Sequence, residues 1–507
     1  MNILDNLIAW IDPERAYKRD AYRFALEEQR ANYDAGGYGR VNNNWNVFNQ
    51  SGELTDRADR DVVRARARDL ERNSDMMNGI ISAYKRNVFG GGYTLQAKTG
   101  NDELNEQIET AWKRWCKKQN CDLTGRQSFN QIMRMAVERK KVDGGILFIK
   151  VFTKDKKLFV PFQIQAIEVD QLDNTATTPK NKGNRVVGGI EFDQHCKPVG
   201  YWFKKADIEG FEVHDPVYYD AKQVIYYFTL KRPTQVREMS DVAQSITRIR
   251  DANEFMTAVS VKERIAACLS VFIKKQLPVS GIGRPNGGIA PTKKFEYDGK
   301  TISPGMIKEL NAGDEIQVIN PNGQSTDAAQ LIKLHQRLVG SGQGLSYEAT
   351  SRDVSEANYS SVRHAMIEDE ETYTEDRELL LDVMTEIFET FVISAVLKGV
   401  VSIPKFWNDT QKYLNHEWIK APKPWIDPAK EANANKIALA TGQKTYKEIC
   451  AENGRDWRKQ LKDQKEVLEY AQELGLEMGG VIYGKASTSK QQQSDSNDEG
   501  SGGNATE

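Results

Sequence analysis

Seven carboxylates gather in one short stretch of this 507-residue chain, between Met366 and Glu378. Only Arg377 opposes them, so the stretch has a net charge of −6; its acids are Glu368, Asp369, Glu370, Glu371, Glu375, Asp376 and Glu378. Carboxylates at positions i, i+1 and i+7 of a helix partly share a face and can hold Mg²⁺ for a nuclease. Five histidines in the whole chain make general bases scarce. We therefore interpret the stretch as solvated, or as facing something that the protein should not bind, and keep a metal-dependent nuclease as the alternative.

Motifs for other chemistries are incomplete. A phosphate-binding loop of the form G-x-x-x-x-G-K-[ST] does not occur, and Gly442-Gln443-Lys444-Thr445 lacks the second glycine. Gly340-x-Gly342-x-Gly344 follows a predicted helix rather than a strand, so a hinge is a better interpretation than a dinucleotide site. His416-Glu417 has no second histidine four residues later, which a zinc protease needs. The sequence predicts a protein that is not an enzyme and needs no cofactor.

Cysteine spacing also argues against a metal site. The chain has an odd number of scattered cysteines, which fits a reducing compartment and free thiols: Cys116, Cys121, Cys196, Cys268 and Cys450. Cys116 and Cys121 form a C-x4-C pair and His195 precedes Cys196, so four ligands could in principle converge on zinc. Their spacings match no usual zinc ligand pair, and we predict ordinary thiols and no metal.

Arginines and aspartates alternate along a predicted helix from Asp56 to Arg86. Mixed charge of this kind usually forms a solvated face with ion pairs four residues apart, which is our interpretation, and phosphate contact is the alternative. The whole chain has 70 basic and 72 acidic residues, a net charge of −2. A protein that holds nucleic acid tightly through phosphates normally has a basic excess, so tight DNA binding is disfavoured.

The stretch 240–398 is predicted to form the central framework of the chain. Its order of long helix, loop-rich insert, helix, polar loop and long helix does not fit a single compact globule. A helical pattern from Met239 to Lys275 is followed by a loop-rich insert, 276–325, with short strand-like runs such as Lys294–Tyr297 and Glu315–Ile319. Helix resumes over Asp327–Leu338, and after a small polar segment a long helix reaches Lys398. Its apolar residues recur every three or four positions, which predicts one broad buried face.

The flanking regions complete an α+β protein. Residues 3–33 predict an amphipathic helical arm that docks on a neighbouring subunit, with membrane attachment as the alternative. The section 143–231 is β-rich, and 429–474 is helical with breaks at Gly442 and Gly454. Candidate strands include Gly145–Phe152, Val186–Phe192 and Val401–Trp407. Residues 485–507 predict a disordered tail, and the sequence contains no recognisable secretory signal or bilayer-spanning run.

Four motifs in the same order resemble the portal proteins of lambda-type tailed phages. They are Arg64-Ala65-Arg66-Ala67-Arg68-Asp69-Leu70 followed by Arg72-Asn73 and Asn78-Gly79; Asn358-Tyr359-Ser360-Ser361-x-Arg363; Trp425-Ile426-Asp427-Pro428-x-Lys430-Glu431-Ala432; and Ala471-x-Glu473-Leu474-Gly475-Leu476. The resemblance covers nearly the whole chain. It implies a mainly helical α+β portal fold in a ring, usually of twelve subunits, at one capsid vertex.

The resemblance also implies how the chain is divided into structural regions. It assigns 1–35 to an N-terminal helical arm, 36–238 to the wing, 239–275 to a stem helix, 276–325 to the clip, 326–343 to the second stem helix, 344–358 to the tunnel loop, 359–424 to the long wing helix and a following strand, 425–484 to the crown and 485–507 to the tail. Implied partners are double-stranded DNA passing through the channel, the terminase large subunit, a head-tail connector or adaptor, the major capsid protein and the scaffold, and no membrane. The implied location is the virion, after assembly in the host cytoplasm.

A DNA channel needs weak contacts, because each neutralised phosphate adds affinity and would slow sliding. Around the implied tunnel loop the expected channel residues are Lys333, Arg337, Tyr347, Arg352, Asn358, Tyr359 and Arg363, with His335 beside them. For the basic ones, an ion pair with Asp353, Glu356 or a neighbour is the alternative. Glu368, Asp369, Glu370 and Glu371 are expected to form an acidic channel or wing patch that repels DNA. A capsid scaffold or adaptor without a channel stays open as a second alternative to the portal function.

Overall fold

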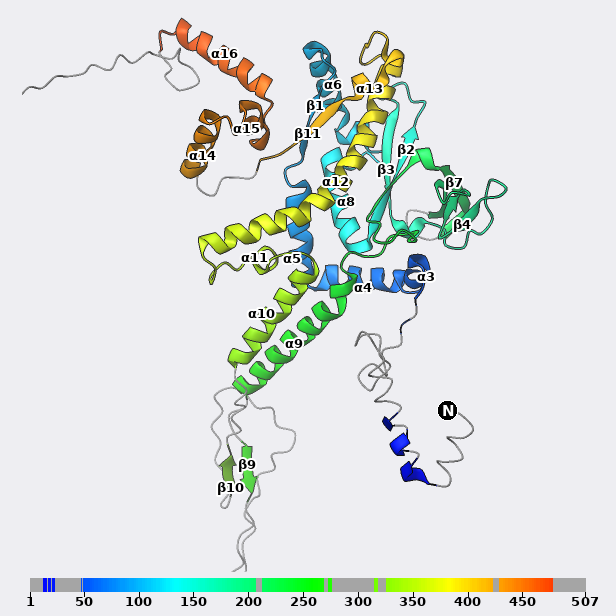
Figure 1. Cartoon of the computed structure of the whole chain (residues 1–507), viewed down its shortest axis with the longest axis vertical. Helices are drawn as coiled ribbons and strands as arrows, with labels where there is room; N and C mark the ends of the chain where they lie inside the picture. The colour runs from blue at the N-terminus through cyan, green and yellow to red at the C-terminus, as the bar shows by residue number, and fades with distance from the viewer. Residues whose placement is uncertain are drawn as a thin grey trace, which may run out of the picture.

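The computed structural model describes residues 49–206, 212–268, 272–275, 314–317, 325–422 and 428–476, with a few positions between 12 and 47. Figure 1 shows a body of helices and sheets from which two helices, α9 and α10, project as a stalk. A group of three helices, α14 to α16, lies at the other end, where Arg458 of α16 binds Asp102 of the body at 2.5 Å. Most of the predicted segments 1–35 and 276–325, and all of 485–507, lie outside the described residues.

Helix α12 (Tyr359–Lys398) runs through the body, and the predicted long helix is confirmed. The Asn358 side chain caps its first turn by accepting a hydrogen bond from the Ser361 amide at 2.8 Å. Gly399 ends it in the left-handed conformation, with φ 77°. Phe388 and Phe391 of its apolar face are fully buried against Trp112 of α6 (Asp102–Trp115), at ring distances of 5.5 and 5.3 Å. This aromatic cluster is the centre of the main core.

The arginine-rich segment is not one helix as predicted. It divides into α3 (Gly52–Asp56), α4 (Arg60–Asn73), α5 (Asp75–Tyr84) and a π-helical turn, η2 (Lys85–Phe89). The break before α5 falls at Ser74, whose backbone is extended and whose hydroxyl accepts a hydrogen bond from the Met77 amide at 3.4 Å. A serine in this role favours a new helix start over continuation of the old one.

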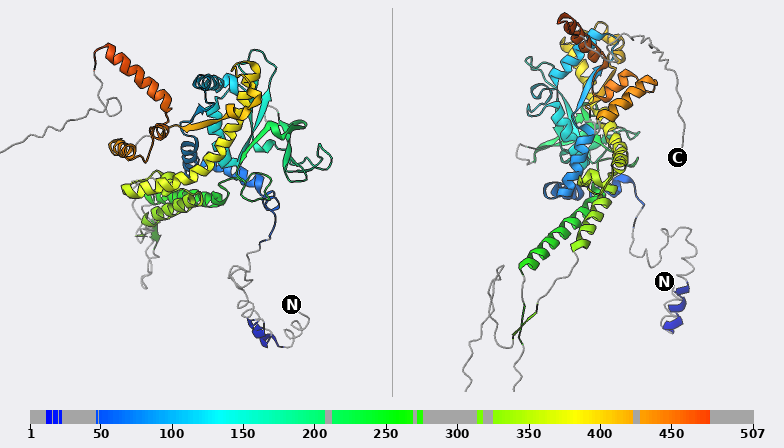
Figure 2. Two further views of the ribbon diagram at one scale, coloured as in Figure 1. Left: turned by 45° about the horizontal axis from the view of Figure 1, so that its top comes forward. Right: turned by 90° about the vertical axis from the view of Figure 1, so that its left-hand side faces the viewer.

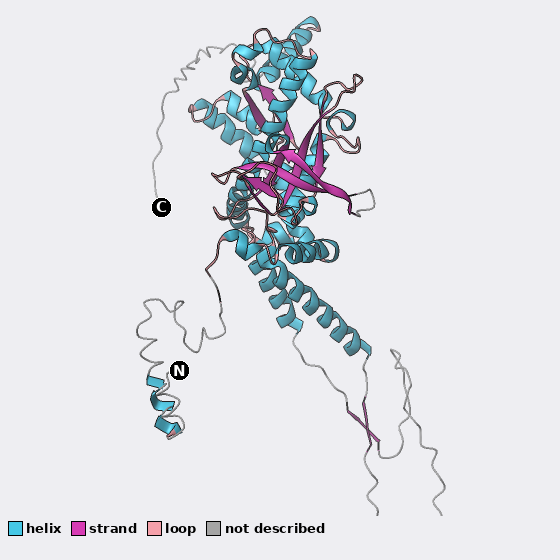
Figure 3. Ribbon diagram, turned by 90° about the vertical axis from the view of Figure 1, so that its right-hand side faces the viewer, coloured by secondary structure: helices cyan, strands magenta, loops and turns pink. Residues whose placement is uncertain are grey.

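Two sheets lie against the helices of the body (Figure 3). In the first, β2 (Gly145–Phe152) pairs with β3 (Phe162–Ile167) and β8 (Val224–Phe228), and the predicted bounds of β2 are confirmed. The predicted strand Val186–Phe192 is instead a hairpin of β4 (Arg185–Val187) and β5 (Ile190–Phe192), because Gly188 and Gly189 both have positive φ. Strands β6 (Pro198–Ala206) and β7 (Glu212–Asp220) complete that second sheet.

Two further strand pairs join distant parts of the chain. Strand β1 (Tyr93–Ala97) pairs with β11 (His416–Lys420), and β9 (Phe272–Lys275) pairs with β10 (Asp314–Gln317). The strand predicted at Val401–Trp407 is wrong: a 3-10 turn, η6 (Phe406–Asn408), lies there, and β11 supplies the partner that β1 needs. The predicted run Glu315–Ile319 overlaps β10.

The stalk consists of α9 (Ile246–Cys268) and α10 (Ser325–Gly342), which lie side by side in Figure 2. The helix predicted over Met239–Lys275 is therefore too long at both ends. Its N-terminal side is held out of the helix by buried contacts of Ser240 and Asp241, and a 3-10 turn, η5 (Ala243–Ser245), leads into α9. Its C-terminal side forms β9.

The remaining short elements connect these parts. They are α7 (Lys118–Cys121), α8 (Phe129–Asp143), η3 (Val169–Gln171), η4 (Ala221–Gln223), α11 (Tyr347–Ser351), α13 (Thr410–Leu414), α14 (Pro428–Ala440), α15 (Tyr446–Glu452) and α16 (Trp457–Glu473). The predicted breaks in the C-terminal helices at Gly442 and Gly454 are confirmed, and both glycines have positive φ. The fold is mostly helical with some sheets. In the part of the chain that the structure describes, no helix combines the length and the apolar character that a membrane crossing needs.

Candidate functional site

The segment that joins the stalk to the long helix is anchored rather than loose. Predicted as a loop over 344–358, it contains the short helix α11 and enters it through Leu345, which is buried. The Tyr84 hydroxyl donates a hydrogen bond to the Gln343 carbonyl at 2.6 Å, and the Gln343 side-chain amide donates to Ser245 Oγ at 3.1 Å. Only the part after α11, from Arg352 to Asn358, lacks such anchors to the body.

Asp369 ties this segment to α12. Its two carboxylate oxygens accept hydrogen bonds from the Ser346 amide and hydroxyl, both at 2.7 Å, and the residue is buried. The sequence places Asp369 in an exposed acidic patch, and this is wrong. The carboxylate instead satisfies the start of α11, where a negative charge also complements the free amides of the first turn.

The predicted channel residues share one region but differ in their freedom to bind DNA. Lys333 forms an ion pair with Glu356 at 2.6 Å, so the ion-pair alternative holds for it. The Arg337 guanidinium lies over the Tyr347 ring at 5.5 Å, and the Tyr347 hydroxyl donates to Asp353 at 3.1 Å. Lys333, Arg337 and Tyr347 therefore shape the segment itself. His335 of α10 has a buried Nδ1 with no hydrogen-bond partner in the structure.

Two further arginines of the predicted set are exposed, as Arg337 also is. Arg352 is exposed and takes the left-handed conformation, with φ 60°, at the end of α11. Arg363 is exposed on the first turns of α12 and contacts the Tyr359 hydroxyl at 3.5 Å. Asn358 serves as the cap of α12, while the Tyr359 ring is half exposed. Arg352 and Arg363 are thus exposed basic side chains that do not lie over the Tyr347 ring as Arg337 does.

The acidic stretch of α12 is less exposed than its sequence suggests. Besides Asp369, Glu370 is bound to Arg377 at 2.5 Å and to Lys420 at 3.3 Å, and Asp376 is bound to Lys140 at 2.5 Å. Four acids remain exposed: Glu368, Glu371, Glu375 and Glu378. The structural use of Glu370 and Asp376 argues against the nuclease alternative, because a metal site would need these carboxylates free. No group of three metal-binding side chains occurs among the described residues.

A buried charge cluster supports the base of the stalk, and nothing in the sequence motifs indicated it. Lys140 of α8 is buried between Asp241, at 2.9 Å, and Asp376 of α12. Lys141 lies 3.5 Å from Asp376, and its ammonium sits 3.4 Å from the centre of the Tyr84 ring. The cluster therefore joins the body, the start of the stalk and the long helix through charged side chains that are almost fully buried.

Stability should depend on pH through Asp241. Burial alone would raise the pKa of its carboxyl, but Lys141, Lys140 and Lys231 together hold that pKa below its usual value. Because the pKa of Asp241 is lower in the folded chain than in the unfolded chain, the ionised carboxylate stabilises the folded state at pH values above the unfolded pKa of about 4. This contribution is lost as the pH falls through the pKa of the folded state. The destabilisation caused by Asp241→Asn should therefore shrink as urea unfolding is repeated from pH 7 toward pH 3. A difference that stays constant over that range would contradict this account.

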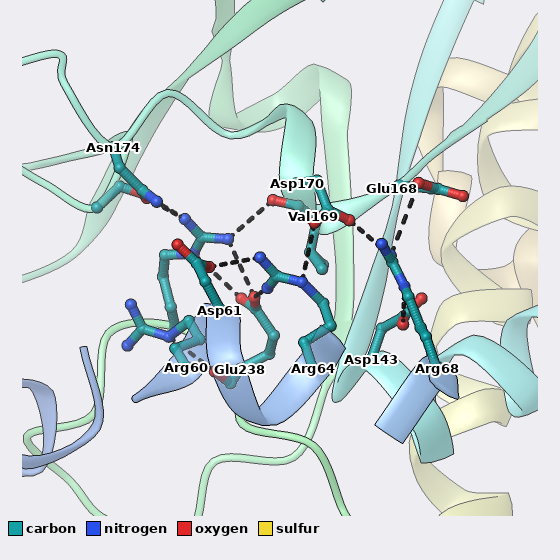
Figure 4. Close-up of polar contacts among 12 residues, drawn as sticks. Arg60, Asp61, Arg64, Arg68, Asp143, Glu168, Val169, Asp170, Asn174 and Glu238 are labelled. Carbon is teal, nitrogen blue, oxygen red and sulfur yellow. Dashed lines mark hydrogen bonds and ion pairs between the residues drawn. The ribbon is translucent and has the colours of Figure 1, made fainter. Parts of the chain in front are cut away.

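A second buried network corrects the interpretation of the arginine-rich helix (Figure 4). Arg60 and Arg64 of α4 are buried, and Arg64 binds Glu238 at 2.9 Å and Asp170 at 2.9 Å. Arg60 binds Glu53 at 2.7 Å, and Arg68 binds Asp143 at 2.7 Å. These three arginines recur every four residues on one face and form structural ion pairs, so that face is neither solvated nor a phosphate site. The predicted solvated face is confirmed for the other side of α4, where Arg66 is exposed and Arg72 lies 3.8 Å from Asp69.

Arg237 and Glu238 lie at the centre of this network and have no exposed surface. Arg237 donates to Glu238 at 3.0 Å and to the Val169 carbonyl at 2.8 Å. The Tyr226 hydroxyl contacts the same carboxylate, and burial followed by the Glu238 charge raises the pKa of that phenol. Residues 237 and 238 are thereby fixed between α4, η3 and β8, only eight residues before α9 begins.

The thiols are separate from both charge clusters. Cys116 is half-buried and Cys121 is buried, and burial raises the pKa of the Cys121 thiol to about 12. Cys196 is exposed in the turn between β5 and β6, and Cys450 is buried in α15. Among these four described cysteines none forms a disulfide.

The described residues form a mostly helical body with a two-helix stalk, and buried ion pairs join its parts. The family model described as "Phage portal protein, lambda family" matches residues 38–377. This match covers well over half of the chain, which therefore belongs to the lambda family of phage portal proteins. Proteins of this family are structural components of the virion.

Two relatives of the chain are portal proteins of phages. The chain is 26% identical over 432 residues to the "Probable portal protein" of Halomonas phage phiHAP-1, which covers 82% of each chain. It is 21% identical over 486 residues to "Portal protein B" of Escherichia phage lambda, covering 87% of this chain and 90% of that one. A chain from the neck of a native gene transfer agent particle, computed with C12 symmetry, is 13% identical with a TM-score of 0.42, covering 77% of this chain and 93% of that one.

Proposed function

We propose that copies of this chain assemble into a ring at one capsid vertex, with an axial channel through which double-stranded DNA is packaged and ejected. The ring serves as the docking platform for the terminase large subunit and the head-tail connector, and it has no catalytic activity of its own. The capsid protein and scaffold surround it during assembly in the host. Family membership over 38–377 is the observation that carries this proposal.

The stalk supports assembly through its exposed apolar surface. Leu331, Leu334 and Leu338 of α10 follow one another at three- and four-residue steps and are 37%, 50% and 42% exposed. Such a row on a two-helix stalk leaves apolar area in water that a neighbouring stalk would cover. A head-to-tail contact of this kind generates a closed ring when its rotation closes. The insert 276–325 at the end of the stalk is then the part presented to the motor and the connector.

Charge around the segment 344–363 supports a conduit that holds DNA weakly. Exposed Arg352 and Arg363 supply a few phosphate contacts, while exposed Glu368 and Glu371 on the next turns of α12 lower the overall attraction. Asp369 and Glu370 contribute less to this repulsion, because both are engaged in the structural contacts described above.

Negative-stain electron microscopy with light scattering tests the assembly. The expected result is rings with a central hole and a mass near a dozen chains of 57.4 kDa. Monodisperse monomers or dimers at every concentration would contradict the proposal. They would favour a capsid adaptor without a channel.

Replacing Arg352 by alanine tests the proposed DNA contact. Each phosphate contact that is lost should reduce the slope of log affinity against log salt concentration by roughly 0.9, because fewer counterions are released. The measurement is binding of duplex DNA to assembled rings at several salt concentrations. Lys333→Ala is the matched control, since Lys333 is already paired with Glu356, and it should change the slope less. Equal slopes for Arg352→Ala and the unmodified protein would show that Arg352 does not touch DNA.

A further inference from the structure

A cavity of about 510 Å³ lies on one flank of α12, between that helix, α11 and η2. Apolar side chains form much of its wall: Ala349, Val354, Val362, Ala365 and Met366. Two exposed arginines, Arg86 and Arg352, stand at its rim together with Glu348. The residues of α12 that line it, from Val362 to Tyr373, are spaced at three- and four-residue steps and therefore share one side of the helix.

The other flank of the same helix carries an apolar knob. Ile367 is 54% exposed and lies roughly 140° around the helix from the middle of the cavity wall, at about 100° per residue. Arg363 and Glu371 are its neighbours one turn before and one turn after, and both are exposed. An exposed apolar side chain with charged neighbours matches this cavity, which has an apolar wall and charged lining residues. Cavity and knob lie at the same level along α12.

We propose that Ile367 of one copy inserts into this cavity on the next copy, so that each α12 contributes a knob on one flank and a socket on the other. The inference rests on the proposed ring, because a rotation about the ring axis keeps equivalent residues at the same height. A socket and a knob at one level on opposite flanks can then meet around a closed ring. The socket is incomplete in a single copy and is filled by a residue of its neighbour.

Charge complementarity selects a second copy as the occupant. Two exposed arginines, Arg86 and Arg352, line the socket together with one half-exposed acid, Glu348. Asp369 also lines it, but this carboxylate is buried and bound to Ser346. The knob has the opposite balance, because exposed Glu368 and Glu371 flank Ile367 and only Arg363 opposes them. A basic socket attracts an acidic knob, whereas two sockets or two knobs would repel each other.

Disulfide trapping between copies tests the contact. The variant Ile367→Cys/Val354→Cys is made in a Cys196→Ser background, because Cys196 is the exposed thiol among the described cysteines. Val354 is a 54% exposed socket residue, so its thiol is accessible. Mild oxidation of assembled rings should give a ladder of covalent multimers on a non-reducing gel, which reductant removes. A disulfide within one chain would give no multimers, so the ladder reports contact between copies.

The matched control replaces Leu397 instead of Ile367. Leu397 is 69% exposed near the far end of α12, and Leu397→Cys/Val354→Cys should give no ladder. Rings that form normally but give no ladder with Ile367→Cys/Val354→Cys, or the same ladder with the control pair, would overturn the knob and socket while leaving the proposed function intact. Absence of rings in the unmodified protein would overturn the proposed function itself.

Assembly measurements give an independent readout. Ile367→Asp places a carboxylate in the apolar socket, and the concentration needed for half-maximal ring formation should rise about tenfold or more. Leu397→Asp introduces the same charge on the same helix and should leave that concentration unchanged. Circular dichroism confirms that both variants are folded. Ring formation by folded Ile367→Asp at the unmodified concentration would overturn the inference.

Discussion

Glu238→Ala is expected to destabilise the folded chain by about 3–5 kcal/mol, the range for breaking a buried ion pair by removing one partner. Glu238 has no exposed surface and binds both Arg237, at 3.0 Å, and Arg64, at 2.9 Å. Without the carboxylate, two buried guanidinium groups lose a partner in surroundings where water cannot replace it. Urea unfolding followed by circular dichroism measures the change.

Two matched variants separate the loss of charge from other causes. Glu238→Gln keeps the hydrogen-bonding shape without the charge, so its loss should be smaller than that of Glu238→Ala. Glu168→Ala removes a carboxylate that lies 3.6 Å from Arg68 but is 59% exposed, and it should cost within about 0.5 kcal/mol. A Glu238→Ala protein as stable as Glu168→Ala would show that the network does not hold the base of the stalk.

Lys140→Met is expected to cost about 3 kcal/mol, because it removes the buried cation that lies between Asp241 and Asp376. The two carboxylates then keep only Lys141, which they share, and Lys231, which is 46% exposed and reaches Asp241 alone. The methionine keeps most of the volume, so the loss reports charge rather than a cavity. The double variant Lys140→Met/Asp376→Leu removes both charges of that pair and should recover most of the stability.

The control for Lys140 is an exposed pair of similar geometry. Lys444 binds Glu452 at 2.7 Å, with side chains 38% and 51% exposed, and Lys444→Met should cost less than about 1 kcal/mol. Thermal unfolding of the three variants gives the comparison. If Lys140→Met/Asp376→Leu is no more stable than Lys140→Met, the destabilisation does not come from the unpaired carboxylates.

Local patterns in the sequence predicted the elements that depend on local physics. The apolar positions of α12 recur at three- and four-residue steps from Leu380 to Val396, and Gly399 follows the last turn, so the predicted end at Lys398 is confirmed. The helix begins at Tyr359, slightly earlier than the polar segment up to Ser361 indicates, because Asn358 caps its first turn. Strand β2 is a run of apolar and β-branched residues and was predicted at its observed bounds. The breaks at Gly442 and Gly454 follow from glycine's tolerance of positive φ.

Predictions failed where partners come from distant parts of the chain. Strand β11 exists because β1, more than three hundred residues earlier, needs an antiparallel neighbour, and its own sequence carries only a weak strand pattern. The helix predicted from Met239 begins later because Asp241 is held by lysines of α8, which no local pattern records.

The sequence by itself determined the family, the mostly helical α+β character, the long helix and the near balance of charge. Only the tertiary structure decided which charged side chains stay exposed and which are bound in contacts within the chain. Arg60, Arg64, Asp369 and Asp376 look like surface charges in the sequence, yet each is used in a buried or half-buried contact with a residue 23 or more positions away. The physical reason is that the cost of burying a charge depends on whether an opposite charge or a donor lies within about 3 Å, and only the folded chain sets those distances.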